Sequence, residues 1–282
     1  EHLEKYLNCS IHFLKDGLNT KKNHLHSSGV YLMENVRFHE FETKYNSNIP
    51  FLEPDVYCNE AFSCSHRKHT SIIGINANEK CYGYCFIKEI EALNTIIQSR
   101  NLKITAIIGG SKIDDKIKMM ENLSKKVDFI FITGNNVNAY DEKKDFLDSI
   151  SNNKAKIILA EDGIGNTDPS KDPIYIRNFN KKNKSIKIFD IGLKALNTLY
   201  NCINQSDLIF WNGTLGIVEN KNYNSGSISL LNILNKSGAK VIVGGGDTAS
   251  FVNKYDNNFF HVSTGGGASI EYLGNSTLHG II

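Results

Sequence analysis

The sequence lacks long hydrophobic runs, and it also lacks a strong excess of charge of either sign. No uninterrupted apolar stretch approaches the roughly 20 residues that a membrane-spanning helix requires. The chain has 32 Lys and Arg residues and 30 Asp and Glu residues, so its formal net charge is +2. Proteins that bind nucleic acids or anionic membranes usually carry a marked positive charge. We therefore expect neither nucleic acid nor a membrane as a partner.

Paired cysteine motifs are absent as well. None of the 6 cysteines belongs to a C-x-x-C pair, and a chain of 282 residues can bury a core without disulfide bonds. We expect reduced thiols, with Cys81 and Cys85 packed in the interior rather than bound to a metal. No signal-peptide pattern opens the chain, which predicts a cytoplasmic protein. An organelle stays open as an alternative because the chain begins with Glu1 rather than Met.

The common short motifs for nucleotide binding are missing too. The chain contains neither G-x-x-x-x-G-K-[ST] nor G-x-G-x-x-G, and it has no H-R-D or D-F-G motif. His66 and His69 lie three residues apart, but no carboxylate accompanies them, so we do not expect a metal there. If the protein transfers phosphate, it does so on a different architecture.

Two glycine triplets are the most informative feature that is present. Gly244–Gly246 follows the apolar run 241–243, and Gly265–Gly267 follows the run 259–262. A strand that turns through glycines into a helix lets backbone N–H groups approach an anion, and the helix N-terminus adds partial positive charge. Asp247 beside such a turn suits Mg²⁺ between its carboxylate and a phosphate. The pair of turns predicts phosphoryl transfer, whereas the alternative is two tight turns with no ligand.

Strands and helices alternate through the second part of the chain, which predicts a parallel sheet with helices on its faces. Ligands of such sheets bind at the carboxyl ends of the strands, where this chain repeatedly places glycine or polar residues. The expected helices include 195–203 and 227–234. The expected strands are 105–108, 129–133, 156–160, 185–189, 208–211, 240–243 and 259–262.

The first part of the chain is expected to contain strands at 8–15, 30–37 and 55–62, followed by a helix at 86–98. That helix has an apolar stripe at positions 86, 90, 93 and 97. Arg37 and Arg67 follow strands, and guanidinium groups grip carboxylates and phosphates through two parallel hydrogen bonds. They predict a site for a small anionic substrate, and the alternative is two solvated surface arginines.

The unit after the strand at 105–108 places two cations at a helix start. Its helix is expected to bury residues 113, 117, 120 and 123, with Lys112 and Lys116 projecting from its first turn. Cations at a helix start interact unfavourably with the helix dipole, and a bound polyphosphate would offset that unfavourable interaction. The alternative is that Asp114 and Asp115 balance this charge at the surface.

Several motifs, in this order along the chain, resemble those of the phosphoglycerate kinase family. They are ENVRFHE, NEAF followed by SHRKHTS, IIGGSKIDDKI, DIG, WNGTLGIVE, VGGGDTA and HVSTGGGASIEYL, and they cover most of the chain from about residue 30. The resemblance implies an α/β fold of two Rossmann-like, three-layer αβα parallel-sheet domains around a hinged cleft. It implies a remainder of the 3-phosphoglycerate-binding domain at 1–85, an interdomain helix at 86–100 and a nucleotide-binding domain at 101–282. The end of the chain would pack back toward the first domain.

The resemblance also implies roles for single residues. Arg37 and Arg67 would bind 3-phosphoglycerate, and Asp247 would bind the Mg²⁺ that accompanies ATP or ADP. Catalysis would fall to Lys116 and to the triplet Gly265, Gly266 and Gly267. The implied nucleotide-binding residues are Lys112, Lys116, Asn212, Glu219, Gly245, Gly246, Asp247 and Thr248.

The implied protein is a monomeric glycolytic kinase that transfers phosphoryl reversibly between 1,3-bisphosphoglycerate and ADP. Its sequence departs from the family pattern, because the family's D-F-N-V-P and H-L-G-R-P motifs do not occur in it. Gly134-Asn135-Asn136 stands where the family has three glycines, and Glu60 and Thr214 replace an Asp and a Pro. We therefore expect an incomplete N-terminal domain. The alternative function is a truncated or degenerate relative that binds MgADP or MgATP without catalysis.

Overall fold

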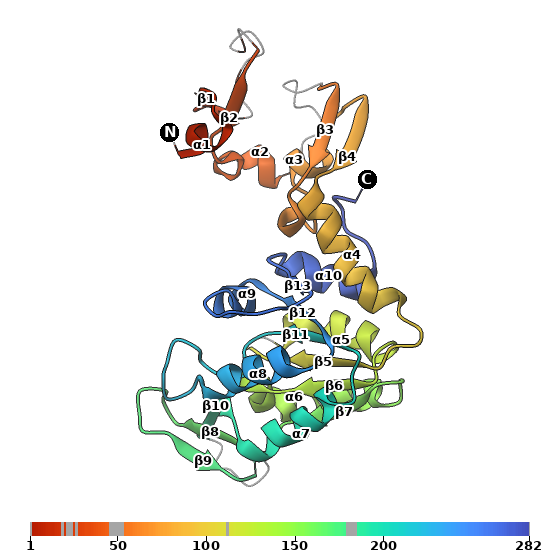
Figure 1. Ribbon diagram of the computed structural model, residues 1–282, viewed down its shortest axis with the longest axis vertical. Helices are drawn as coiled ribbons and strands as arrows, with labels where there is room; N and C mark the ends of the chain where they lie inside the picture. Colours follow the sequence, from red (N-terminus) through yellow and green to blue (C-terminus); the bar gives the residue numbers. More distant parts are fainter. Residues whose placement is uncertain are drawn as a thin grey trace. The chain divides into compact units, whose positions relative to one another are not determined.

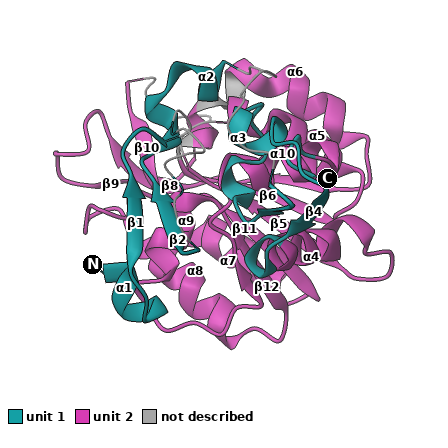
Figure 2. Ribbon diagram, turned by 90° about the horizontal axis from the view of Figure 1, so that it is seen from above, with its two compact units in different colours: residues 1–86, 278–282 teal, residues 87–277 magenta. Residues whose placement is uncertain are grey.

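The computed structural model describes residues 2–17, 20, 25, 28–44, 54–110, 113–178 and 185–281, apart from the side chains of 135 and 139–141. The chain divides into two compact units (Figure 2). Unit 1 consists of Glu1–Phe86 with Leu278–Ile282, and unit 2 consists of Ile87–Thr277. The boundary between the units falls inside one helix, α4 (Tyr84–Gln98).

Unit 1 contains two pairs of parallel strands within its described residues. β1 (Ile11–Leu14) pairs with β2 (Val30–Met33), and β3 (Val56–Asn59) pairs with β4 (Glu79–Tyr82). The helical segments of unit 1 are α1 (His2–Leu7), η3 (Val36–Phe38), α2 (Glu40–Thr43), η4 (Phe62–Cys64) and α3 (Thr70–Ile73).

The three strands predicted in this part of the chain correspond to β1, β2 and β3, although each is shorter than expected. β2 ends early because Asn35 caps the following 3-10 turn, and its side chain accepts a hydrogen bond from the Arg37 backbone N–H at 3.1 Å. β4 was not predicted, since Glu79 and Lys80 interrupt the apolar pattern that marks a strand.

Unit 2 is built around a six-stranded sheet in which every pair of neighbouring strands is parallel (Figure 1). Its strand order is β13-β12-β11-β5-β6-β7. Six of the predicted strands are thereby confirmed. Their bounds are β5 (Ile104–Ile108), β6 (Phe129–Ile132), β7 (Lys156–Leu159), β11 (Leu208–Asn212), β12 (Lys240–Gly244) and β13 (His261–Val262).

The predicted strand at 185–189 does not join this sheet, so that expectation is wrong. β10 (Lys187–Ile191) pairs antiparallel with β8 (Gly163–Asn166), which in turn pairs antiparallel with β9 (Ile174–Ile176). The chain reverses between β8 and β9 through a turn in which Asp168 accepts a hydrogen bond from the Ser170 backbone N–H at 2.8 Å. β8 is thus the antiparallel partner of β10, and β8 was not predicted because two of its four residues are glycine.

Helices pack on both faces of the six-stranded sheet, which explains why its strands are apolar at nearly every position. One face carries Ile107, Phe131 and Trp211, which form a buried cluster with residues of α7, α8 and α9. Alternate positions face the other side, where α5 and α10 pack together. The helical segments of unit 2 are η5 (Asp114–Lys116), α5 (Ile117–Ser124), η6 (Gly134–Ala139), α6 (Tyr140–Ser151), α7 (Leu193–Ile203), α8 (Ser225–Lys236), α9 (Gly246–Val252) and α10 (Gly267–Asn275).

Two predicted helices differ in detail from the structure. The buried face of α4 runs through Phe86, Leu93 and Ile96, whereas the predicted positions 90 and 97 are only half-buried. The predicted helix from residue 113 is divided, because a 3-10 turn, η5, precedes α5. Lys116 ends that turn as the N-cap of α5 and does not project from the first turn of the helix. Lys112 lies outside the described residues.

Candidate active site

The sheet of unit 2 has a point at which its strand order reverses. From β5 the chain builds outward through β6 and β7, and it then returns to the other side of β5 to add β11, β12 and β13. β5 and β11 are joined beyond their ends, where the Gly109 N–H donates to Asn212 O and the Gly110 N–H donates to Thr214 O, each at 2.8 Å. Open α/β sheets bind ligands at such a reversal, at the carboxyl ends of the strands.

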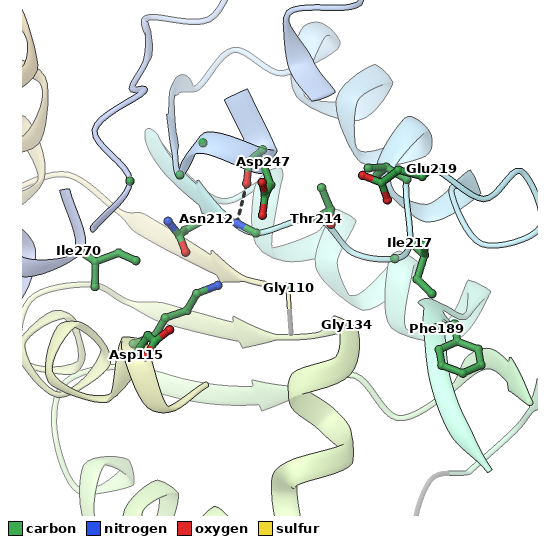
Figure 3. Close-up of a pocket in the computed structure, with 18 of the residues that line it drawn as sticks. Gly110, Asp115, Gly134, Phe189, Asn212, Thr214, Ile217, Glu219, Asp247 and Ile270 are labelled. Atoms are coloured by element: carbon green, nitrogen blue, oxygen red, sulfur yellow. Dashed lines mark hydrogen bonds between the residues drawn. The ribbon is translucent and has the colours of Figure 1, made fainter. Parts of the chain in front are cut away.

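A cavity of about 630 Å³ lies at this edge of the sheet (Figure 3). The volume falls in the range of small-molecule sites, roughly 300–1,000 Å³. Ile270 lies at one end of the cavity and Phe189 at the other, with Asn212 and Thr214 between them. All lining residues belong to unit 2: Gly110, Asp115, Lys116, Gly134, Lys187, Ile188, Phe189, Asn212, Gly213, Thr214, Gly216, Ile217, Val218, Glu219, Gly245, Gly246, Asp247, Thr248, Gly266, Gly267 and Ile270.

Lys116 is a buried cation in the wall of this cavity. It is 8% exposed, and its Nζ donates a hydrogen bond to the Gly109 backbone oxygen at 2.5 Å. Burial lowers the pKa of the Lys116 ammonium to about 8, while the carboxylates of Asp115 and Asp247 act in the opposite direction. A cation that has lost part of its hydration and faces a cavity is well placed to bind an anion.

The loop after β11 is tied to the start of α9 by side-chain hydrogen bonds. The Gly213 N–H donates to Thr248 Oγ1 at 2.8 Å, and Asn212 Nδ2 donates to the Gly244 oxygen at 3.0 Å. Both polar side chains are buried, at 2% exposed for Asn212 and 1% for Thr248. These contacts hold the loop and the glycine turn in register at the rim of the cavity.

The two glycine turns place two helix starts at the cavity. Gly245 precedes α9 with φ of 99°, and Gly266 precedes α10 with φ of 53°. Residues other than glycine rarely adopt such positive φ angles, so both turns depend on glycine. Neither helix start has a side-chain cap. The first N–H groups of each helix are therefore available to an anion.

Gly265 differs from the rest of its triplet. Its N–H donates to the hydroxyl of Ser263 at 3.1 Å, and that hydroxyl also contacts the hydroxyl of Ser269 at 2.8 Å. Gly265 is therefore buried behind the turn, whereas Gly266 and Gly267 line the cavity.

The donor set for a metal is sparse. Among the described residues, no cluster of three or more His, Cys, Asp or Glu side chains could hold a metal ion. Asp247 is exposed in the first turn of α9 and lines the cavity. Mg²⁺ is commonly held by one or two carboxylates together with the phosphate oxygens of a substrate. A single carboxylate beside an anion-binding turn fits that arrangement.

The part of the far wall that β10 forms was missed in the sequence. β10 contributes Lys187, Ile188 and Phe189 to this wall, beside Ile217 and Val218. The Ile217 N–H donates to the Phe189 oxygen at 3.0 Å and joins the two segments. The D-I-G motif directly after Phe189 was the signal nearest to β10, and it marks the neighbouring Asp190 rather than the wall itself.

Asp190 is a buried carboxylate beside this wall. It is fully buried and accepts hydrogen bonds from the N–H groups of Ile191 and Gly226, each at 2.9 Å, and from the hydroxyl of Ser225 at 3.1 Å. Burial raises the pKa of Asp190 to about 6, and the three hydrogen bonds oppose that rise. The carboxylate fastens the start of α8 to the end of β10.

The predicted substrate residues Arg37 and Arg67 belong to unit 1. Burial lowers the pKa of His69. The carboxylate of Glu42 opposes that fall, and the positive charges of Arg67 and Arg37 add to it. Arg37 is exposed and Arg67 is half-buried, with its Nε 3.3 Å from His66 Nε2. Buried Glu42 lies 3.5 Å from His69 Nδ1 and accepts hydrogen bonds from the N–H and hydroxyl of Ser71.

The structure thus places the predicted residues in two groups. Arg37 and Arg67 both belong to unit 1. The cavity of unit 2 brings together Lys116, Asn212, Glu219, Gly245, Gly246, Asp247, Thr248, Gly266 and Gly267. Lys112 remains outside the described residues, and Gly265 supports the turn without lining the cavity.

The sequence and the fold were compared with known proteins. The sequence model of the family described as phosphoglycerate kinase matches residues 1–275. The phosphoglycerate kinase of Mycoplasmoides gallisepticum is 32% identical over 293 residues, which cover 89% of this chain and 71% of that protein. The phosphoglycerate kinase of a Wolbachia endosymbiont of Brugia malayi is 32% identical over 312 residues, covering 99% of this chain and 78% of that protein.

Solved structures agree with these matches. The phosphoglycerate kinase of Coxiella burnetii has a TM-score of 0.82 and 28% identity, covering 99% of this chain and 77% of that one. The enzyme from Pyrococcus horikoshii has a TM-score of 0.78 and 22% identity, covering 99% and 79%, and supports the fold alone. Among the described residues, no helix has both the length and the apolar character needed to cross a bilayer. From its motifs, its fold and these relatives, the chain belongs to the phosphoglycerate kinase family.

Proposed function

We propose that this member of the family transfers a phosphoryl group reversibly between 1,3-bisphosphoglycerate and ADP, and that the cavity of unit 2 binds the nucleotide. The observation that carries the proposal is the meeting of Lys116, two uncapped helix starts and Asp247 in one cavity at the reversal of the sheet. Each of these groups favours a polyphosphate over a neutral ligand.

The chain's residues would act mainly by fixed charge and position. A phosphoryl group in transfer spreads negative charge over its oxygens, and preorganised positive groups lower the barrier. The ammonium of Lys116 and the N–H groups at Gly266 and Gly267 are already held around the cavity. The acceptor of the reverse reaction is a carboxylate, which is ionised near neutral pH, so no general base is needed.

Asp247 is the residue we propose as the Mg²⁺ ligand, together with phosphate oxygens of the nucleotide. The metal would neutralise phosphate charge during transfer. Thr248 and Asn212 hold the turn that carries Asp247, through their hydrogen bonds to Gly213 and Gly244. Gly245 and Gly246 would let the backbone approach the phosphates, and Glu219 lines the far wall, where the ribose is expected.

We propose that unit 1 binds 3-phosphoglycerate through Arg37 and Arg67. Two guanidinium groups suit a ligand with a carboxylate and a phosphate. The boundaries 1–85, 86–100 and 101–282 remain our proposal for the functional domains, with Lys112 as a further phosphate contact. A monomer, no nucleic-acid partner and a cytoplasmic location belong to the same proposal.

The test is turnover of the purified protein with 3-phosphoglycerate and MgATP, coupled to glyceraldehyde-phosphate dehydrogenase so that NADH oxidation reports the product. We expect activity that Asp247→Asn abolishes or strongly reduces. The matched control is Asp256→Asn, an exposed aspartate that does not line the cavity. Calorimetry of MgADP with the same proteins separates the outcomes. Binding without turnover would select the non-catalytic alternative, and the absence of both would reject the proposal.

A further inference from the structure

Two cysteines of unit 1 lie directly opposite each other on neighbouring strands. β3 and β4 run parallel and side by side, and their register pairs Cys58 with Cys81 (Figure 1). Side chains at paired positions of neighbouring strands point to the same face of a sheet. Both cysteines are exposed. The expectation that Cys81 and Cys85 pack in the interior is therefore wrong, since both are exposed.

The opposite face of the strand pair is occupied by other contacts of unit 1. The Tyr57 hydroxyl donates to the Ser71 oxygen at 2.9 Å, and Asn59 Nδ2 donates to the Gly280 oxygen at 3.0 Å. Tyr57 and Asn59 alternate with Cys58 along β3, so Cys58 points away from those contacts. Val56 lies on the same face as Cys58 and is 54% exposed, which shows that this face is open to solvent.

The two thiols interact with each other. Loss of hydration raises the pKa of the Cys58 thiol, and a hydrogen bond with the Cys81 thiol adds to the rise, with a further contribution from Glu60. Neighbouring strands are separated by about 4.7–4.9 Å. Cysteines joined by a disulfide have Cα atoms about 4.4–6.8 Å apart. Paired positions on β3 and β4 thus fall within the Cα separation that a disulfide requires.

We propose that Cys58 and Cys81 form an exposed dithiol that closes to a reversible disulfide by exchange with a low-molecular-weight disulfide. One cysteine thiolate attacks a sulfur of the small disulfide and displaces its first thiol, which leaves a mixed disulfide on the protein. The second cysteine attacks the protein sulfur of that mixed disulfide, forms the bond between β3 and β4, and releases the second small thiol. The two protein thiols lose two electrons and two protons, and the small disulfide is reduced to two thiols.

The remaining cysteines do not offer the same arrangement within the described part of the chain. Cys202 is buried, and Cys64 is half-buried in η4. Cys9 and Cys85 are exposed, but neither lies opposite another cysteine in the strand registers. Exposed disulfides are the ones that reductants reach, so the bond between Cys58 and Cys81 would open again with a thiol reductant.

The experiment treats the reduced chain with oxidised glutathione, blocks remaining thiols by alkylation, and maps the digested protein by mass spectrometry without reduction. We expect the peptides of Cys58 and Cys81 to be linked, so that these residues account for the loss of two of the 6 thiols. Dithiothreitol should restore both. In Cys58→Ser, Cys81 should instead retain glutathione, because no second thiol displaces it.

Matched controls are Cys85→Ser and Cys9→Ser, which should leave the link between Cys58 and Cys81 unchanged. Circular dichroism of each variant checks that it folds as the wild type does. Separate glutathione adducts on Cys58 and Cys81 of the folded wild type would overturn the proposal. So would failure of both residues to react, or a link between Cys81 and Cys85.

Discussion

At the scale of single residues, the chain concentrates its unusual choices at the cavity of unit 2. A lysine is rarely buried, because its ammonium loses hydration, yet Lys116 is 8% exposed. A negatively charged ligand restores the lost interaction, which gives Lys116 a role that a surface lysine could not have.

The protonation of Lys116 predicts the pH dependence of the reaction. The pKa of about 8 lies below the ordinary lysine value, so the ammonium loses its proton as the pH rises through 8. We expect kcat/KM to fall in that range, because this parameter reports ionisations of the free enzyme. Lys116→Met should reduce kcat by about 10²–10³, the usual loss for one preorganised charge stabiliser, and should remove this limb of the profile. A profile of the variant that still falls through pH 8 would show that another group is responsible.

Gly266 provides a second residue-scale prediction. Its φ of 53° is unfavourable for a β-branched side chain, so Gly266→Val should distort the start of α10 at a cost of about 1–3 kcal/mol. We expect lower phosphoryl transfer and weaker MgADP binding, measured by the coupled assay and by calorimetry. Gly238→Val is the matched control, because a side chain there would meet no atom within 4 Å and its φ is not in the left-handed region. Unchanged transfer in Gly266→Val would mean that this turn does not contact the phosphates.

At the scale of elements, the site depends on how the loop after β11 is joined to α9. One of the two hydrogen bonds that make this connection uses a hydroxyl, since the Gly213 N–H donates to Thr248 Oγ1 at 2.8 Å. Thr248 is 1% exposed, so water cannot readily replace its hydroxyl as the hydrogen-bond partner of the Gly213 N–H.

Thr248→Val removes that hydroxyl and keeps the shape of the side chain. The N–H of Gly213 would lose its partner, which typically costs about 1–3 kcal/mol for a buried donor. We expect a lower free energy of unfolding and a higher Kd for MgADP, measured by denaturant titration and calorimetry. Thr248→Ser should retain both properties largely, because its hydroxyl can make the same bond. Equal losses in the two variants would attribute the effect to packing rather than to the hydrogen bond.

Elements also show where sequence reasoning succeeds and fails. The six strands of the parallel sheet were predictable because apolar runs such as Phe129–Ile132 are buried on both faces and end in glycine or polar residues. The sequence located β10 but assigned it to the parallel sheet, because the alternation of strands and helices does not indicate the direction of a strand. The cavity wall at Phe189 and the burial of Lys116 depend on contacts distant in sequence, so a linear pattern could not reveal them.

At the scale of the whole molecule, the proposed ligands are divided between the two units. Arg37 and Arg67 belong to unit 1, and the cavity residues belong to unit 2. A substitution in one unit should therefore change the affinity for the ligand of that unit and leave the affinity for the other ligand unchanged.

Arg37→Ala tests that division. It removes an exposed guanidinium of unit 1, so we expect a higher KM for 3-phosphoglycerate, by about 10-fold for the loss of one charge-assisted contact. The Kd for MgADP should not change, as calorimetry would show. Lys44→Ala, an exposed cation of unit 1 that pairs with Glu40, is the control. Equal weakening of both ligands by Arg37→Ala would contradict the division.

Unit 1 is not continuous in sequence, and this has a consequence for synthesis. The Gly280 N–H donates to the Ser65 oxygen at 2.8 Å, and its own oxygen accepts from Asn59, so residues 278–282 complete the packing around β3 and η4. A ribosome makes these residues only after all of unit 2. The first 86 residues therefore stay incompletely packed until the end of the chain is made, whereas unit 2 can fold before then. In nascent chains, unit 2 should therefore become resistant to protease before unit 1.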